Sequence, residues 1–119
     1  MAKTMTKGDL SPARRELVEL LQKINFGRIE GLAIHDGDPV LSPAVAVVRD
    51  IKFGGENGPR PEVGVGDFTL KAQVVDLFAH LDQMDKGIIR SLEVKHGLPF
   101  RMTVRETHEG SNQPNQRTR

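Results

Sequence analysis

The sequence predicts an α+β fold, in which two α-β-β repeats form a four-stranded antiparallel sheet with two helices on one face. Two observations predict it. An amphipathic helical pattern occurs twice, and each time a hairpin pattern with a two-residue turn follows it. The second hairpin also repeats the sequence of the first at an offset of 60 residues. One α-β-β unit cannot cover its own sheet face, so we expect two units to pack together.

The first helix is predicted to begin at Ser11 and Pro12. Serine is a favoured N-cap, and proline is tolerated in the first helical turn because its missing N–H has no partner there. Apolar residues follow at the spacing that forms one stripe along a helix: Ala13, Leu17, Leu20, Leu21 and Ile24.

A hairpin is predicted after this helix. In its first strand Leu32 and Ile34 share one face, and Ile29 lies on the other. An Asp-Gly pair at 36–37 suits a tight turn that needs positive φ at both residues. The return strand, within 39–53, contains two prolines, which favour a position at the edge of the sheet.

Residues 54–66 are rich in glycine and proline and are predicted to form a long loop. Asp67 is then predicted as the N-cap of a second helix. This helix has the stronger apolar stripe: Leu70, Val74, Leu77, Phe78, Leu81 and Met84. A second hairpin is predicted to turn at the His-Gly pair 96–97, since histidine tolerates the left-handed region better than most residues. Its last strand alternates apolar and polar residues over 100–105.

Five residues of the first hairpin recur in the second: Gly27, Ile29, Leu32, Gly37 and Pro39. The helices match at an offset of 57, and residues 48–50 match 104–106 at an offset of 56. Geometry imposes such residues on any helix-hairpin unit, so convergence is the alternative. The repeated order of elements favours duplication.

The predicted organisation is a single domain of two repeats joined by a loop, between a flexible N-terminus and a disordered tail. The domain covers 11–106. The five segments are 1–10, 11–53, 54–66, 67–106 and 107–119.

The segment LVELLQKINFGRIEGLAIHDGDPVLS, from residue 17 to about 42, resembles the YezD-type family of very small bacterial proteins. The shared pattern is a short amphipathic helix, an aromatic-Gly pair, a strand, an Asp-Gly turn and an apolar return strand, and it extends more loosely over 74–104. The chain departs from this pattern at Pro43, in the loop 54–66 and in its tandem arrangement. The resemblance implies a fold and a bacterial cytoplasmic setting. It implies no active site, because the molecular function of the family is not established.

Composition excludes several classes of protein. The chain has no cysteine, so disulfides, thiolate metal sites and cysteine nucleophiles are excluded. Its 17 Lys and Arg residues balance 16 Asp and Glu residues, so the net charge favours neither nucleic acid nor a membrane surface. No stretch is long and apolar enough to span a bilayer, so we expect a cytoplasmic protein with no membrane partner.

No catalytic residue, metal site or cofactor is predicted. His35 lies beside Asp36 and Asp38, but the side chains of a tight turn diverge and do not surround an ion. The acidic pairs are expected to be exposed, whereas general acid-base catalysis needs a desolvated cleft. We therefore expect a protein that is not an enzyme.

Two features are candidate binding sites. The segment 51–62, IKFGGENGPRPE, has glycines whose N–H groups suit an anion, and its alternative role is a plain connector. A basic stripe is expected where the two return strands place Arg49 and Arg105 at equivalent positions. The candidate residues are Arg49, Lys52, Gly54, Gly55, Asn57, Arg60, Arg101 and Arg105.

The leading hypothesis is a small non-catalytic binding or regulatory module that engages a protein partner through its open sheet face and the 51–62 loop. The alternative is a nucleic-acid-binding protein that uses the basic stripe and the loop. The chain has five Phe and no Trp or Tyr, which weighs against stacking on single-stranded nucleic acid. The oligomeric state stays open.

Overall fold

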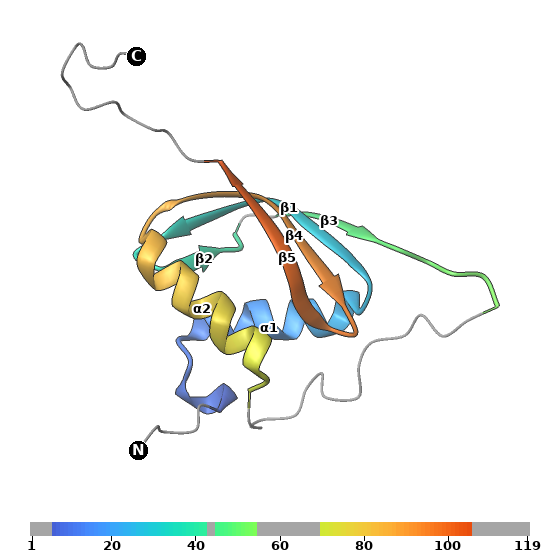
Figure 1. Cartoon of the computed structure of the whole chain (residues 1–119), viewed down its shortest axis with the longest axis horizontal. Helices are drawn as coiled ribbons and strands as arrows, with labels where there is room; N and C mark the ends of the chain where they lie inside the picture. Colours follow the sequence, from blue (N-terminus) through green and yellow to red (C-terminus); the bar gives the residue numbers. More distant parts are fainter. Residues whose placement is uncertain (1–5, 43–44, 55–69, 106–119) are drawn as a thin grey trace, which may run out of the picture.

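Two helices and a five-stranded antiparallel sheet form the described part of the chain (Figure 1). The computed structural model describes residues 6–42, 45–54 and 70–105. In chain order the elements are η1 (Lys7–Asp9), α1 (Pro12–Ile24), β1 (Gly27–His35), β2 (Asp38–Val40), β3 (Ala46–Arg49), α2 (Ala72–Met84), β4 (Gly87–Lys95) and β5 (Leu98–Arg105). The predicted α+β class is confirmed.

The sheet has the strand order β2-β1-β4-β5, and β3 also pairs with β1. Since β4 lies along one side of β1, β2 and β3 share the other side, where Ile34 pairs with Pro39 and Ile29 with Val47. The expected number of four strands is therefore wrong. The return strand of the first hairpin is divided in two, because β2 ends at Val40 and β3 begins at Ala46.

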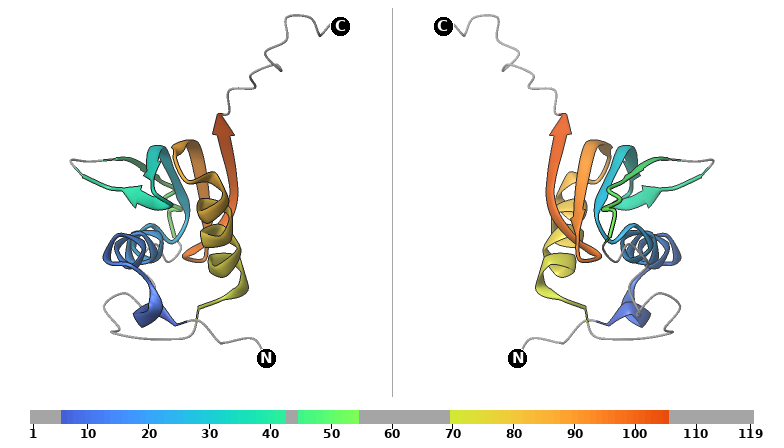
Figure 2. Two further views of the ribbon diagram at one scale, coloured as in Figure 1. Left: turned by 90° about the vertical axis from the view of Figure 1, so that its left-hand side faces the viewer. Right: turned by 90° about the vertical axis from the view of Figure 1, so that its right-hand side faces the viewer.

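Both helices pack on the same face of the sheet (Figure 2). α1 contacts β2 most and also β3 and β5, whereas α2 contacts β5. At the start of α1, the Ser11 hydroxyl accepts a hydrogen bond from the backbone N–H of Arg14 at 3.2 Å, as the predicted N-cap requires. The start predicted for α2 is wrong. Its N-cap is Lys71, which makes no side-chain capping bond, and Asp67 lies outside the described residues.

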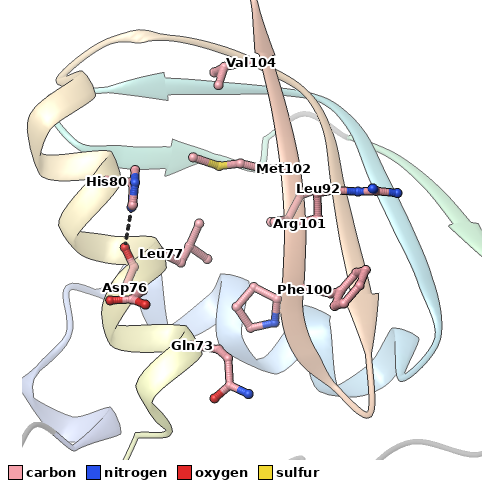
Figure 3. A pocket seen from close by; sticks show the side chains of 10 residues that line it. Gln73, Asp76, Leu77, His80, Leu92, Phe100, Arg101, Met102 and Val104 are labelled. Atoms are coloured by element: carbon pink, nitrogen blue, oxygen red, sulfur yellow. Dashed lines mark hydrogen bonds between the residues drawn. The ribbon is translucent and has the colours of Figure 1, made fainter.

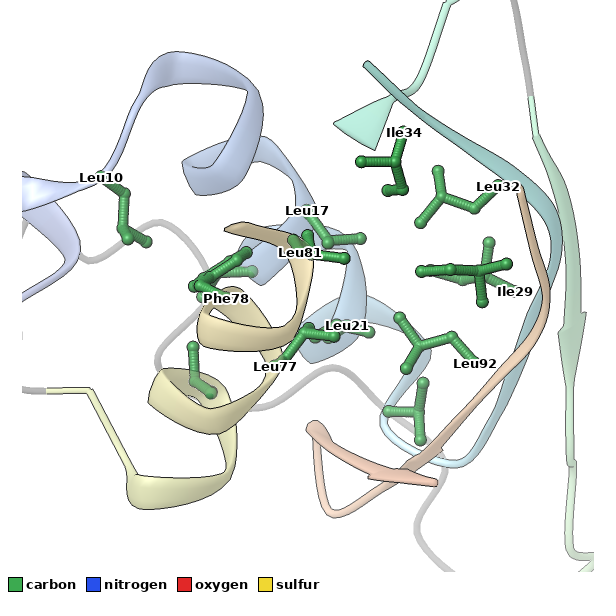
Figure 4. Close-up of a cluster of buried hydrophobic side chains, with 14 of the residues drawn as sticks. Leu10, Leu17, Leu21, Ile29, Leu32, Ile34, Leu77, Phe78, Leu81 and Leu92 are labelled. Atoms are coloured by element: carbon green, nitrogen blue, oxygen red, sulfur yellow. The ribbon is translucent and has the colours of Figure 1, made fainter. Parts of the chain in front are cut away.

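The core lies between the helices and the central strands (Figure 4). Its most deeply buried side chains are Leu17, Leu21, Ile29, Leu32, Leu81, Ile89, Leu92 and Val94. The sequence places Ile29 on the face opposite Leu32 and Ile34, but all three are buried. The regular alternation of the strand is interrupted between Ile29 and Leu32, where Gly31 has a φ of +71° and is absent from the pairs of the β1–β4 ladder.

Both predicted hairpin turns have positive φ at their two central residues, as the tight turn demands. The pairs are Asp36-Gly37 and His96-Gly97, which stand 60 residues apart. The helices end at Asn25 and Asp85, again 60 residues apart and again with positive φ. The offset of 57 taken from the helix sequences is therefore wrong, and one offset of 60 relates α1 and β1 to α2 and β4.

The two hairpin turns contact the ends of the helices in a reciprocal way. The N–H of Gly37 donates to the carbonyl oxygen of Asp85 at 2.7 Å, and the N–H of Gly97 donates to that of Asn25 at 2.9 Å. The β1–β4 ladder has the same reciprocity, since Gly27 pairs with Val94 and Ile34, 60 residues before Val94, pairs with Gly87.

Residues 6–10, which the sequence assigns to a flexible end, are part of the packed structure. Lys7 lies in η1 with its side chain buried, and its Nζ forms an ion pair with Glu19 of α1 at 2.6 Å. This ion pair lowers the pKa of Glu19, chiefly through the hydrogen bond from Lys7. Leu10 joins the core cluster. Within the described segments, no helix has the length and apolar character needed to cross a membrane.

Candidate binding surface

The face of the sheet that points away from both helices, here called the open face, carries two rows of side chains across the strands. Residues that pair directly in an antiparallel ladder project to the same face. The first row, here called the charged row, consists of Val48, Arg28, Glu93 and Arg101 from β3, β1, β4 and β5 in turn.

Arginines of the charged row are held by glutamates. Arg28 Nε lies 2.7 Å from an oxygen of Glu30, and the Arg101 guanidinium lies 3.1 Å from Glu93. The hydrogen bond to Glu30, and then its charge, raises the pKa of Arg28 above its already high ordinary value. These arginines stay charged, but much of their charge is compensated locally.

The second row, here called the apolar row, consists of Val40, Ala33, Ile88 and Arg105 from β2, β1, β4 and β5. Two of its apolar side chains face water, with Val40 exposed by 40% and Ile88 by 53%. The open face therefore has a charged end and an apolar end that finishes at an arginine.

Basic residues predicted to form one stripe are dispersed. Arg49 of β3 pairs with Gly27 of β1, and Arg105 of β5 pairs with Ile88 of β4. Because Gly27 and Ile88 lie near opposite ends of the β1–β4 ladder, the two arginines lie at opposite ends of the sheet. Because β1 and β4 lie between them, the distance from β3 to β5 is roughly 14 Å at the usual strand spacing. The two arginines were expected to have equivalent positions, but they are offset by one residue. Arg105 pairs with Ile88, and the residue 60 positions before Ile88, Arg28, pairs with Val48 and not with Arg49.

Of the segment 51–62, the structure describes Ile51, Lys52, Phe53 and Gly54, and all four are exposed. Gly54 has a φ of +84°. The remaining candidate residues, Gly55, Asn57 and Arg60, lie outside the described residues. Phe53 is exposed by 94% and Ile51 by 59%, so the described part of the segment presents apolar side chains as well as Lys52.

A cleft that sequence reasoning missed lies between α2 and β5 and has a volume of about 410 Å³ (Figure 3). Leu77 from α2 and Met102 and Val104 from β5 line it. Asp76 and His80 line it from α2, where the Nδ1 atom of His80 is 3.0 Å from the Asp76 carbonyl oxygen. The cleft is mainly apolar inside.

A smaller cleft of about 160 Å³ has the corresponding place beside α1. There, Leu20 of α1 faces Leu41 and Val45 from the segment that separates β2 from β3. The second hairpin has a continuous return strand, β5, with two register shifts against β4. The sequence signal that could have indicated the larger cleft is the longer return segment of the first hairpin, because only that hairpin has extra residues to fill the space beside its helix.

Among residues 6–42, 45–54 and 70–105, no three His, Asp or Glu side chains are grouped as a metal site would require. Comparisons with protein-family models, with curated proteins and with solved structures find no match for this chain. The geometry of the chain itself therefore carries the functional argument.

Proposed function

We propose that the protein is a small non-catalytic binding or regulatory module, which engages a protein partner through its open face and the 51–62 segment. The observation that carries this proposal is the apolar row. Val40 and Ile88 flank Ala33, one on each side, on a surface that neither helix covers. Neighbouring exposed apolar side chains on a sheet face are typical of surfaces that bind another protein.

The charges around this row favour an acidic partner. Arg105 ends the apolar row, and Arg90 lies on β4 between the two rows. Neither arginine forms an ion pair with a described residue. A partner with an apolar centre and carboxylates at its rim would match this distribution, since charge complementarity guides association and orientation.

The architecture that we propose for this module is a tandem duplication of an α-β-β unit. Support comes from eight residues that are identical at the offset of 60: Leu10, Leu17, Leu21, Gly27, Ile29, Leu32, Gly37 and Pro39. The reciprocal hydrogen bonds of Gly37 and Gly97 and the reciprocal β1–β4 register also favour it, because two equivalent units around a two-fold axis exchange contacts in this way. The resemblance to the YezD-type family supports a bacterial cytoplasmic setting.

Photo-crosslinking from the open face tests the proposed function. A photoreactive amino acid is placed at Ile88, or at the exposed Gln83 on α2 as the matched control, and the native host cells are illuminated. We expect a discrete crosslinked product of one protein partner from position 88 and none from position 83. The same products from both positions, or none from position 88, would refute the proposal.

Nucleic acid is the second candidate, and the arginines Arg90 and Arg105 are the observation in its favour. A gel-shift titration at low salt decides it, because phosphate-driven binding is strongest there. We expect no shift, since Glu30 and Glu93 compensate Arg28 and Arg101. A shift that Arg105→Ala and Arg90→Ala weaken would replace the protein partner by nucleic acid.

A further inference from the structure

Ile51 and Phe53, which follow β3, are apolar residues without a visible cover. In an extended chain, every second residue projects to the same side of the sheet, and residues related in this way are said here to have the same parity. Ile51 and Phe53 have the parity of Val47, which lies in one row with Ile29 and Leu92 on the side of the helices. Phe53 is the most exposed large apolar side chain of the described residues, at 94%. Two neighbouring exposed apolar side chains beside an edge strand are typical of a surface that binds another surface.

The opposite edge of the sheet has the complementary feature. Among the described strands β5 pairs only with β4, so its outer edge leaves backbone donors and acceptors open over Leu98–Arg105. The cleft beside α2 adjoins this edge, and Met102 and Val104 line it (Figure 3). A strand added to β5 would therefore place alternate side chains in the cleft, as peptides do when they extend a sheet.

The strand directions allow β3 of one copy to fill this place in another. β1 is antiparallel to β3 and to β4, and β4 is antiparallel to β5, so β3 and β5 run in opposite directions. A second copy displaced sideways would bring its β3 beside β5 as an antiparallel pair, with all helices on the same side. Val47 and Met102 lie in one helix-facing row, so residues of the parity of Val47 would enter on the side of the cleft.

Charge on the other side of the added strand also matches. Asp50 has the parity of Val48, which belongs to the open face, and its charge acts on Arg28 of that face. In the antiparallel register that places Ile51 and Phe53 opposite Val104 and Met102, Asp50 would lie opposite Arg105 and Lys52 opposite the neutral Thr103. Arg101 contributes less, because Glu93 already compensates its charge. Attraction between Asp50 and Arg105 would favour this alignment over one that opposes like charges.

We propose that the segment Asp50 to Phe53 of one copy extends the sheet of a second copy at β5, with Ile51 and Phe53 in the cleft beneath α2. The association is head-to-tail, because the donor edge and the acceptor edge are different surfaces. It therefore produces a concentration-dependent series of oligomers unless the series closes into a ring. This inference shares residues 51–53 with the proposed function and rests on it in that respect alone. The open face stays accessible in the proposed association.

Sedimentation velocity over a wide concentration range tests the proposal. We expect the mass of the wild-type protein to rise with concentration, and Phe53→Asp to abolish the rise. Because Phe53 is exposed, this variant should keep the native fold. Phe53→Leu, which keeps an apolar side chain, is the matched control and should retain association.

A mixing experiment identifies the two edges. Met102→Lys places a cation in the cleft and should also give monomers, whereas an equal mixture with Phe53→Asp should give a two-chain complex and nothing larger. Each variant keeps one functional edge, so they can join only once. If Met102→Lys fails to fold by circular dichroism, the two Phe53 variants decide alone.

A wild-type protein that stays monomeric, or an association that Phe53→Asp leaves unchanged, would overturn the inference. Val40→Asp should leave association intact, since Val40 lies on the open face in β2, away from β5. Crosslinks from position 88 that persist in a monomeric protein would leave the proposed function standing, so the two failures are distinguishable.

Discussion

Gly27 and Gly87 begin β1 and β4 with almost the same backbone conformation, at φ values of +152° and +157°. Their surroundings differ. A Cβ atom on Gly27 would overlap the backbone carbonyl oxygen of Val48, whereas on Gly87 the nearest atom would be Met84 Cε at 2.8 Å. A strand backbone cannot move aside alone, but the end of a methionine side chain can.

We therefore predict that Gly27→Ala destabilises the protein far more than Gly87→Ala. Both variants share the unfavourable φ, which costs about 1 kcal/mol, and Gly27→Ala adds overpacking against β3 of about 1 to 3 kcal/mol. Urea unfolding of both variants gives the comparison. Equal losses would mean that β3 yields readily and does not hold its place on β1.

At this scale the sequence predicts residues whose role is local. The turns at Asp36 and His96 follow from residue chemistry alone. The buried position of Ile29 does not, because the alternation of β1 is interrupted between Ile29 and Leu32, and residue type alone does not signal this break. The partner of Arg101 could not be predicted either, since Glu93 reaches it only through the register of β4 and β5.

Among the elements, α2 has a start that residue type does not explain. Lys71 has the extended φ and ψ of an N-cap, −74° and 158°, but makes no capping bond with its side chain. In α1 the corresponding place is taken by Ser11, which makes this bond. Asp67 is the better cap by residue type, but the helix starts after it, next to the buried Leu70.

We predict that Lys71→Asp stabilises the protein by about 1 kcal/mol, because an aspartate side chain can accept from an N–H group of the first turn and also suits the helix dipole. Lys71→Ala, which cannot cap, is the control and should leave the melting temperature nearly unchanged. If both substitutions raised it equally, removal of the lysine charge and not capping would be the cause.

Helices and hairpins were predictable because apolar spacing and turn residues signal them directly. The division of the first return strand was not, because it depends on the long-range pairing of β2 and β3 with β1, and the segment between Val40 and Ala46 separates these two strands in the chain. The same segment explains the missed cleft: its Leu41 and Val45 narrow the space beside α1, and β5 has no counterpart to it.

In the whole molecule the central pair β1 and β4 is the best protected part. Each of these strands is paired on both sides, and each contributes fully buried residues such as Ile29 and Ile89. The two edges differ, because β3 has only four residues, Ala46–Arg49. The arrangement of the candidate binding site depends on the order of the strands, which the sequence does not reveal: β1 and β4 lie between the strands of Arg49 and Arg105.

Hydrogen exchange should follow this arrangement. We predict that backbone amides in β1 and β4 exchange most slowly, near the rate set by global unfolding, and that those of β3 exchange fastest within the sheet. Amide exchange followed by NMR measures it. Slower exchange in β3 than in β4 at low protein concentration would contradict this order of stability.

The hydrogen bonds from Gly37 to Asp85 and from Gly97 to Asn25 also have a consequence for folding. Each helix is completed at its C-terminal end by a donor that the other half of the chain supplies. Neither half alone can supply the hydrogen-bond donor to the carbonyl oxygen at the C-cap of its own helix. The two halves should therefore fold and unfold in a single transition. A chain with only one of them would have to obtain the missing donor from another molecule.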